Sequence, residues 1–288
     1  MKKISIICIL IFTSSFIFCQ TNKPKQTDSG KPFVLGVTEE IQSVELAEKR
    51  VLNIYLPEGY DNSDTIKYSV IYLLDGSADE DFIHVVGLVQ FNSFDWINRV
   101  PKSIVVGIAN VDRKRDFSFL TTSEADKKRY PTSGHSDKFI SFLEKELQPF
   151  IEKKYKTNST KTIIGESLGG LLAAEILLKK PTLFNKYIII SPSLWWDNGS
   201  LLNQPLLFLN EKFAPKIDIY IGVGKEGLTP SDIPHVMEVD ANLLAEKIKN
   251  AKSKNVTTFF DYLPQEDHAT IGHQAIYNAM KIVYSIGK

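Results

Sequence analysis

The chain has 288 residues, of which 43% are hydrophobic and 24% charged, a composition typical of a globular protein with one large domain. It carries 34 basic and 34 acidic residues, so the formal net charge is zero. No basic patch indicates a nucleic-acid partner, and no acidic run indicates a charged tail. We therefore expect no nucleic acid among its partners.

The first residues predict export from the cytoplasm. A basic start, Met1-Lys2-Lys3, precedes an apolar stretch over residues 4–18 that is too short for a comfortable membrane span. This pattern predicts a signal peptide over residues 1–19 and a periplasmic or secreted protein. The alternative is a lipoprotein signal with the lipid on Cys19, although Ile17-Phe18 poorly matches the small residues that such a signal prefers. Beyond that anchor we expect no membrane contact.

Both cysteines, Cys8 and Cys19, lie in this leader. A mature chain cut after Cys19 would contain no disulfide, no thiol nucleophile and no cysteine-ligated zinc.

A disordered linker is predicted over residues 20–32, and a single domain over residues 33–288. Strands are predicted over residues 33–43, 49–56, 68–74, 103–109, 186–191, 217–223 and 256–263, with one more short strand directly before the turn that contains Ser167. Helices are predicted over residues 79–90, 136–154, 236–250 and 271–285, with one more starting at Leu168, and Pro149 predicts a kink or break. This order predicts an α/β fold: a doubly wound, mostly parallel sheet with antiparallel N-terminal strands and helices on both faces.

The most informative motif is Gly165-Glu166-Ser167-Leu168-Gly169, which lies between a predicted strand and a predicted helix. This is the nucleophile-elbow pattern of α/β-hydrolases. The serine must lie at the apex of a sharp turn, and a side chain at either flanking glycine would collide with the neighbouring strand or helix. We predict that Ser167 is a catalytic nucleophile; the alternative is a structural serine in a tight turn.

A serine nucleophile needs a base within hydrogen-bond reach. His268 lies in the loop directly after the last predicted strand, where the base is expected. The alternative is that His268 is a surface histidine and that His273, on the final helix, replaces it.

The base in turn needs an orienting group. Glu226 follows the strand over residues 217–223 and fits the chain order of serine, acid and histidine. Asp232 and Asp240 are close enough in sequence to compete. The remaining alternative is a site without an acid, in which a backbone carbonyl holds the imidazole.

The oxyanion hole should use the backbone N–H of Leu168 and a second N–H from the loop after residues 68–74. Gly76 or Ser77 would supply that second donor.

Three further residues are candidates for substrate binding. Arg113 and Arg115 could hold an acidic or catechol-type substrate, or they could pair with Asp112 and Asp116 to brace their loop. Trp196 could form an apolar wall for an aromatic or acyl group, or it could be a packing anchor. The sequence contains no H-E-x-x-H motif, no cysteine pair and no dense Asp/His set, so we expect neither metal nor cofactor.

Together these residues make the chain resemble the esterase D, or putative esterase, family of α/β-hydrolases over about residues 33–286. The resemblance depends on residues 72–76, 112–116, 142–151, 165–170 and 191–196 and on His268. The family includes enterobactin-type trilactone esterases, feruloyl and acetyl xylan esterases, and S-formylglutathione hydrolases. It implies hydrolysis of a carboxylic ester through an acyl-enzyme without a cofactor, with Ser167 as nucleophile and His268 as base. In the siderophore branch the acid can be absent, and arginines of the Arg113 and Arg115 loop can contact the siderophore.

We therefore expect a monomeric serine esterase that acts on a small-molecule ester, either a siderophore trilactone or a phenolic or acyl sugar ester. Export disfavours a cytoplasmic thioester substrate. The alternatives are an acyltransferase of the same fold and a non-catalytic binding protein on a hydrolase scaffold.

Overall fold

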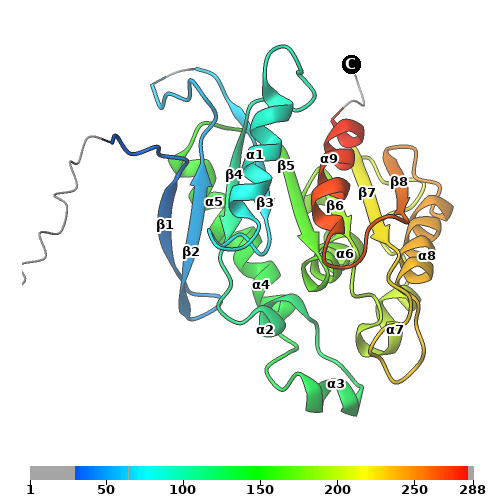
Figure 1. Cartoon of the computed structure of the whole chain (residues 1–288). Coiled ribbons are helices and arrows are strands. Elements are labelled where there is room, and N and C mark those ends of the chain that lie inside the picture. The colour runs from blue at the N-terminus through cyan, green and yellow to red at the C-terminus, as the bar shows by residue number, and fades with distance from the viewer. Residues whose placement is uncertain (1–29, 64, 285–288) are drawn as a thin grey trace, which may run out of the picture. The chain divides into compact units, whose positions relative to one another are not determined.

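The computed structural model of the chain describes residues 30–63 and 65–284 (Figure 1). The predicted signal peptide, including Cys19, and residues 20–29 of the predicted linker lie outside the described residues. Residues from Leu35 onward belong to one compact unit, which the following paragraphs describe. Within the described ranges, no helix is both long enough and apolar enough to cross a bilayer.

An eight-stranded sheet forms the centre of this unit, with the strand order β1-β2-β4-β3-β5-β6-β7-β8. The strands from β3 to β8 are mutually parallel, whereas β2 pairs antiparallel with β4 and β1 antiparallel with β2. This topology confirms the predicted fold class. The strands are β1 Val37–Ser43, β2 Glu48–Tyr55, β3 Tyr68–Leu73, β4 Ser103–Ile108, β5 Thr157–Glu166, β6 Lys186–Ile190, β7 Ile217–Gly224 and β8 Val256–Leu263.

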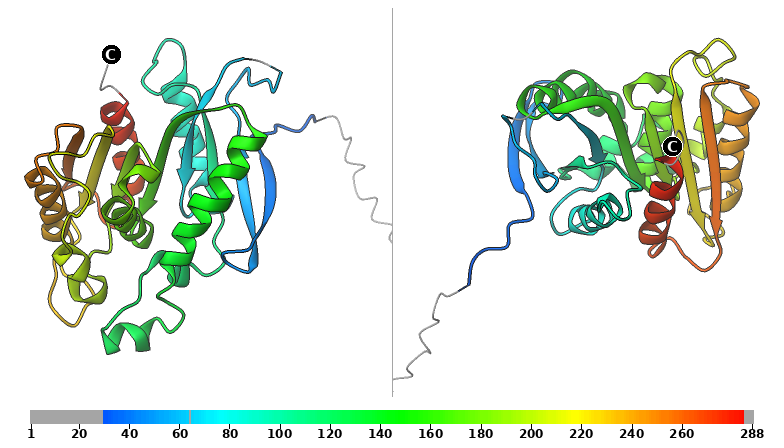
Figure 2. Two further views of the ribbon diagram at one scale, coloured as in Figure 1. Left: turned by 180° about the vertical axis from the view of Figure 1, so that it is seen from behind. Right: turned by 90° about the horizontal axis from the view of Figure 1, so that it is seen from above.

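Helices cover both faces of the sheet, which explains why β3, β4 and β7 are buried along their whole length (Figure 2). On one face, α1 (Phe82–Ser93) and α9 (Ile271–Val283) enclose a hydrophobic core. A larger core lies on the opposite face under α4 (Ser136–Phe142), the π-helix η1 (Leu143–Leu147), α5 (Gln148–Lys154), α6 (Leu168–Lys179) and α8 (Met237–Asn250).

The kink or break predicted near Pro149 is replaced by a π-helical segment, and α4, η1 and α5 follow one another as a continuous helix. The N–H of Gln148 donates to the carbonyl of Leu143, five residues earlier, and the backbone at Leu143 and Gln148 stays helical. A wider turn directly before Pro149 relieves the clash that its ring would make in a regular α-helix.

Several short helices were not predicted from the sequence: α2 (Arg113–Phe117), α3 (Glu124–Arg129), the 3₁₀-helix η2 (Pro181–Leu183) and α7 (Trp196–Asn203). Their lengths give too few turns for a helical period to be visible. The helices α2 and α3 follow β4, and α7 follows β6, so they add to the same edge of the sheet.

That edge is formed by the carboxyl ends of the parallel strands, where ligands bind in open α/β sheets. Three of these strands are followed by a residue with left-handed backbone: Asp75 after β3 (φ 54°), Ser167 after β5 (φ 58°) and Ser191 after β6 (φ 40°). Non-glycine residues are uncommon in this region of backbone space, and such strain concentrates at functional sites. The edge is therefore where a site is expected.

Candidate active site

Ser167 occupies the sharp turn between β5 and α6, with φ 58° and ψ −117°. A Cβ placed on Gly165 would lie 2.4 Å from the carbonyl oxygen of Gly169, so no side chain fits there. At Gly169 the nearest atom, Asp75 Oδ2, would be 3.3 Å away, which is tight but not prohibitive. Gly170 is more constrained, because its Cβ would lie 2.7 Å from the carbonyl of Ile190. The predicted steric requirement for glycine thus holds at position 165 and is weaker at position 169.

The structure brings Ser167, His268 and Glu226 together from the ends of three strands. His268 Nε2 lies 3.1 Å from Ser167 Oγ, and His268 Nδ1 lies 2.5 Å from Glu226 Oε2. The serine follows β5, the acid follows β7 and the histidine follows β8. This arrangement can pass a proton from the hydroxyl to the imidazole while the carboxylate fixes the ring.

The acid is almost completely buried, whereas the histidine is about half-exposed. The Glu226 side chain is 3% exposed, and the His268 side chain is 48% exposed. Burial opposes ionisation of Glu226, but hydrogen bonds from His268 and Ser191 outweigh it and lower the pKa of Glu226. The hydrogen bond to Glu226 raises the pKa of His268 against the opposing effect of burial. The pair is thus set up to stabilise a positive imidazole.

The alternative acids and bases lie in other contacts. Asp240 is buried and accepts from His235 Nδ1 at 2.9 Å, so it is not available to His268. Asp232 is exposed on the loop before α8. His273 lies on α9 with its Nδ1 2.8 Å from His84 Nε2, and the two rings are stacked.

The oxyanion-hole predictions need one correction. The N–H of Gly76 donates to the carbonyl of Ile108 at 3.0 Å, so it cannot face an oxyanion. Gly76 is required for a different reason, since a Cβ there would lie 2.4 Å from the Cα of Gly107 on β4. The N–H of Ser77 makes only a long hydrogen bond, 3.3 Å, to the carboxylate of Glu80.

Leu168 is the first residue of α6, where backbone N–H groups have no acceptor within the helix. Leu168 and Ser77 therefore remain as the candidate pair of donors.

Arg113 borders the site but is already paired. Its Nε and Nη2 atoms contact Asp75 Oδ1 and Oδ2 at 2.6 and 2.9 Å, and Nη2 also donates to the carbonyl of Glu166 at 3.2 Å. Asn110 Nδ2 adds a third donor to Asp75 Oδ1 at 2.7 Å. The arginine thus ties the loop after β3 to the elbow, with 34% of its side chain exposed. Its partner is Asp75 and not the adjacent Asp112 or Asp116.

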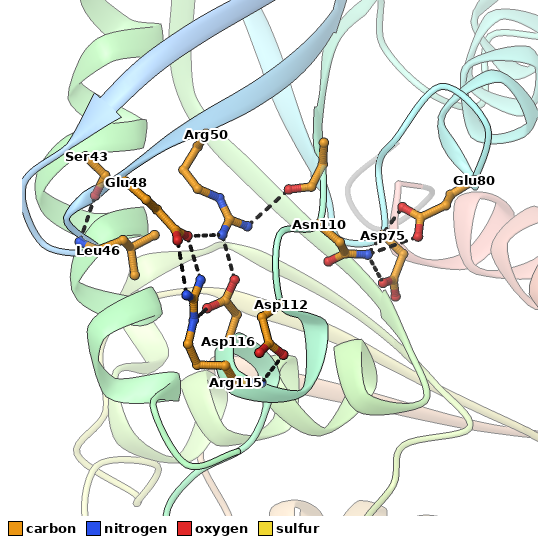
Figure 3. A network of polar contacts seen from close by, with 11 residues as sticks. Ser43, Leu46, Glu48, Arg50, Asp75, Glu80, Asn110, Asp112, Arg115 and Asp116 are labelled. Atoms are coloured by element: carbon orange, nitrogen blue, oxygen red, sulfur yellow. Dashed lines mark hydrogen bonds and ion pairs between the residues drawn. The ribbon is translucent and has the colours of Figure 1, made fainter. Parts of the chain in front are cut away.

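Acids of the protein hold the Arg115 guanidinium (Figure 3), which argues against the predicted contact with substrate. Its Nη2 lies 2.5 Å from Glu48 Oε1 and its Nε 2.8 Å from Asp116 Oδ1. Arg50 Nη1 joins the same cluster, 2.6 Å from Asp116 Oδ2 and 2.8 Å from Glu48 Oε1. The alternative prediction, that Arg115 braces its loop, describes this cluster better.

Trp196 is also corrected, from a pocket wall to a packing residue. Its side chain is 1% exposed, and its indole N–H donates to the carbonyl of Phe119 at 2.9 Å. The residue fastens the segment after β4 to the start of α7 and cannot contact a ligand.

Two serines after β6 belong to the site although the sequence predicted no role for them. Ser191 Oγ donates to Glu226 Oε1, which also accepts from the N–H of Gly224 at 3.2 Å. Ser193 lies beside the nucleophile: its Oγ is 3.3 Å from Ser167 Oγ, and its N–H donates to the Ser167 carbonyl at 3.0 Å. Their position at the carboxyl end of a central strand was the signal that could have found them.

Among the described residues, no group of three or more His, Cys, Asp or Glu side chains is arranged to hold a metal ion.

Comparisons with known proteins place the chain among esterases. A model of the family described as "Putative esterase" matches residues 43–273. The chain is 28% identical to the ferri-bacillibactin esterase BesA of Bacillus subtilis (strain 168) over 221 residues, which are 72% of this chain and 76% of that one. It is 30% identical to a siderophore triacetylfusarinine C esterase of Aspergillus fumigatus over 102 residues, 35% of this chain and 34% of that one.

A solved structure of an IroE-like serine hydrolase from Shewanella oneidensis superposes with a TM-score of 0.76 and 30% identity, covering 87% of this chain and 80% of that chain. The BES protein from Bacillus cereus gives a TM-score of 0.72 with 25% identity, covering 88% of this chain and 98% of that chain. Because the family model spans most of the sequence, the chain belongs to the putative esterase family and is a carboxylic ester hydrolase.

Proposed function

We propose that the protein hydrolyses esters through an acyl-enzyme, with Ser167 as nucleophile, His268 as general base and Glu226 as the orienting acid. The single observation that carries the proposal is the continuous chain of contacts from Ser167 Oγ to His268 Nε2 at 3.1 Å and from His268 Nδ1 to Glu226 at 2.5 Å. A non-catalytic binding protein would not need these hydrogen-bonded contacts between Ser167, His268 and Glu226.

In the first half-reaction, His268 Nε2 takes the hydroxyl proton while Ser167 Oγ forms a bond to the ester carbonyl carbon. The carbonyl oxygen becomes negatively charged and accepts hydrogen bonds from the N–H groups of Leu168 and Ser77. The intermediate then breaks its bond to the alcohol oxygen, which leaves with the proton from His268. Ser167 is left as an acyl ester.

In the second half-reaction, His268 removes a proton from water, and the water oxygen attacks the acyl carbon. The bond to Ser167 Oγ breaks, the serine regains its proton from His268, and the carboxylic acid leaves. Glu226 stays ionised throughout and holds the imidazole through Nδ1, as its lowered pKa favours.

For the substrate we propose a siderophore ester of the trilactone type. The relative with the widest match described above is named a ferri-bacillibactin esterase. Phenolic and acyl sugar esters are the competing class. Export and a monomeric state remain predictions, and the leader lies outside the described residues.

Variants of the three residues test the mechanism. Ser167→Ala and His268→Ala should each lower hydrolysis of p-nitrophenyl acetate by at least about 10³-fold, with unchanged circular dichroism. Asp240→Asn, which alters a carboxylate bound to a different histidine, is the control and should retain turnover. Near-normal turnover in either alanine variant would contradict the proposal.

A substrate panel tests the specificity. It should compare trilactone siderophore with and without iron, a feruloylated sugar and simple acyl esters, with and without a sugar acceptor. We expect the highest kcat/KM for the trilactone. A preference for the feruloylated sugar would contradict the siderophore proposal, and acyl transfer that outcompetes hydrolysis would identify an acyltransferase.

A further inference from the structure

Glu166, the residue directly before the nucleophile, places a second carboxylate beside the site. Its backbone lies between Gly165 and Ser167 at the end of β5, and its side chain is partly buried. Its carboxylate points at the first turn of α9, because a Cβ placed on Gly272 would lie 2.6 Å from Glu166 Oε2. A glycine at position 272 therefore leaves the space that this carboxylate occupies.

The first turn of α9 is fixed to the loop that carries His268. The Asp267 side chain accepts from the N–H groups of Ala269 and Thr270 at 2.9 and 3.1 Å, and the Asp267 carbonyl accepts from the N–H of Ile271 at 3.1 Å. Glu166 thus packs against the same short rigid segment that presents the imidazole.

The charges around Glu166 come from several elements. Asp75 and Asp81 lie on the segment between β3 and α1 and repel its negative charge, as does Glu226 after β7, whereas His268 attracts it. Arg113 of α2 donates to the backbone carbonyl of Glu166. On the helix side, His273 follows Gly272 on α9 and is stacked on His84 of α1.

We propose that Glu166 is a second positioning carboxylate of the site, whose negative charge shares with Glu226 the stabilisation of the imidazolium that forms on His268. This inference rests on the proposed roles of Ser167 and His268. Glu166 takes no proton from the substrate or the serine; it acts on the imidazole through space.

The ionisation of both groups is consistent with this coupling. Burial and the repulsion of Asp81 raise the pKa of Glu166 to about 7, while His268 pulls it down. The charge of Glu166 in turn raises the pKa of His268, after the larger effect of Glu226. Above about pH 7 Glu166 is ionised and supports the imidazolium; as the pH falls through that value it takes up a proton and the support is lost.

The direct test measures the His268 pKa by NMR titration of the histidine ring carbons in the full-length protein. Glu166→Gln keeps the shape and removes the charge, so the His268 pKa should fall by about half a unit or more. Glu166→Asp keeps the charge and should retain part of the shift. Asp79→Asn, which removes an exposed carboxylate from the loop after β3, is the control and should leave the pKa unchanged.

Kinetics give a second readout on p-nitrophenyl acetate. In Glu166→Gln the acidic limb of kcat/KM should move to lower pH, and the plateau above pH 8 should fall about three- to tenfold because a weaker base remains. A structural defect would lower the plateau without moving the limb.

An unchanged His268 pKa in Glu166→Gln, with Glu166→Asp equally without effect, would overturn the proposal. If Ser167→Ala proved fully active, the proposed function would fail instead, and the NMR titration would still decide whether Glu166 and His268 are coupled.

Discussion

The buried ion cluster that anchors α2 to β2 gives a sharp prediction for stability. Arg50 and Asp116 form its centre, with side chains 0% and 1% exposed, and Glu48 and Arg115 complete it. Two cations and two carboxylates make the cluster neutral (Figure 3). Asp116→Asn keeps the shape but leaves one uncompensated positive charge beside a fully buried guanidinium.

Breaking a buried pair by removing one partner costs about 3–5 kcal/mol, because the remaining charge stays desolvated. For a chain of this size each kcal/mol corresponds to about 2–4 °C in Tm, so a loss of about 3–5 kcal/mol should lower the Tm of Asp116→Asn by about 6–20 °C. Replacing both members, as in Arg50→Met with Asp116→Leu, removes the stranded charge and should cost much less than either single change.

The neighbouring residue offers a matched control. Lys49 pairs with Glu40 on the surface, with side chains 58% and 56% exposed, and such pairs contribute about 0–1 kcal/mol. Urea unfolding followed by tryptophan fluorescence gives the free energy of unfolding for Asp116→Asn and Lys49→Ala. Equal losses in the two variants would refute the reasoning that burial makes the difference.

Four further predictions concern the site and its supports. Gly165→Ala should yield little folded protein, measured as soluble yield and thermal unfolding, because its Cβ would lie 2.4 Å from the helix backbone. Trp196→Phe should lose about 1–3 kcal/mol in urea unfolding by leaving a buried carbonyl without its donor, yet keep the wild-type KM; a raised KM would restore Trp196 as a pocket residue. Since Glu226 raises the pKa of His268, activity should fall on acidification with a midpoint above 6.5, the ordinary imidazole value, and a midpoint below it in the pH profile would contradict this. Ser191→Ala removes a donor to ionised Glu226 and should lower kcat about tenfold, whereas an unchanged kcat would exclude that support.

The proximity of Ser167 and His268, the proposed nucleophile and base, could be predicted because each position depends on local sequence. Ser167 is marked by the glycines of its turn, and His268 by its place directly after the last strand. Glu226 was one of three candidate acids, and only the fold shows that Asp240 is occupied by His235.

What the sequence could not give depends on contacts between distant segments. Gly76 looked like an amide donor, but the pairing of β3 with β4 directs that amide to Ile108. Arg113 finds Asp75, 38 residues earlier in the chain, in preference to the acids beside it. Trp196 looked suitable for a ligand wall. A large aromatic side chain is equally suited to a hydrophobic core, and the sequence does not distinguish the two positions.

Glu226 has a mechanical consequence beyond its electrostatic one. Its two oxygens bind partners that follow β6 and β8, so the carboxylate links three adjacent strands from the middle one. β8 is the outermost of these and has no neighbour on its far side in the described sheet, and strands in that position open most readily. If β8 separated briefly from β7, His268 would move away from Ser167 while the rest of the sheet stayed intact. On heating, activity would therefore be lost at a lower temperature than that of global unfolding. Turnover would then report whether β8 is still paired with β7.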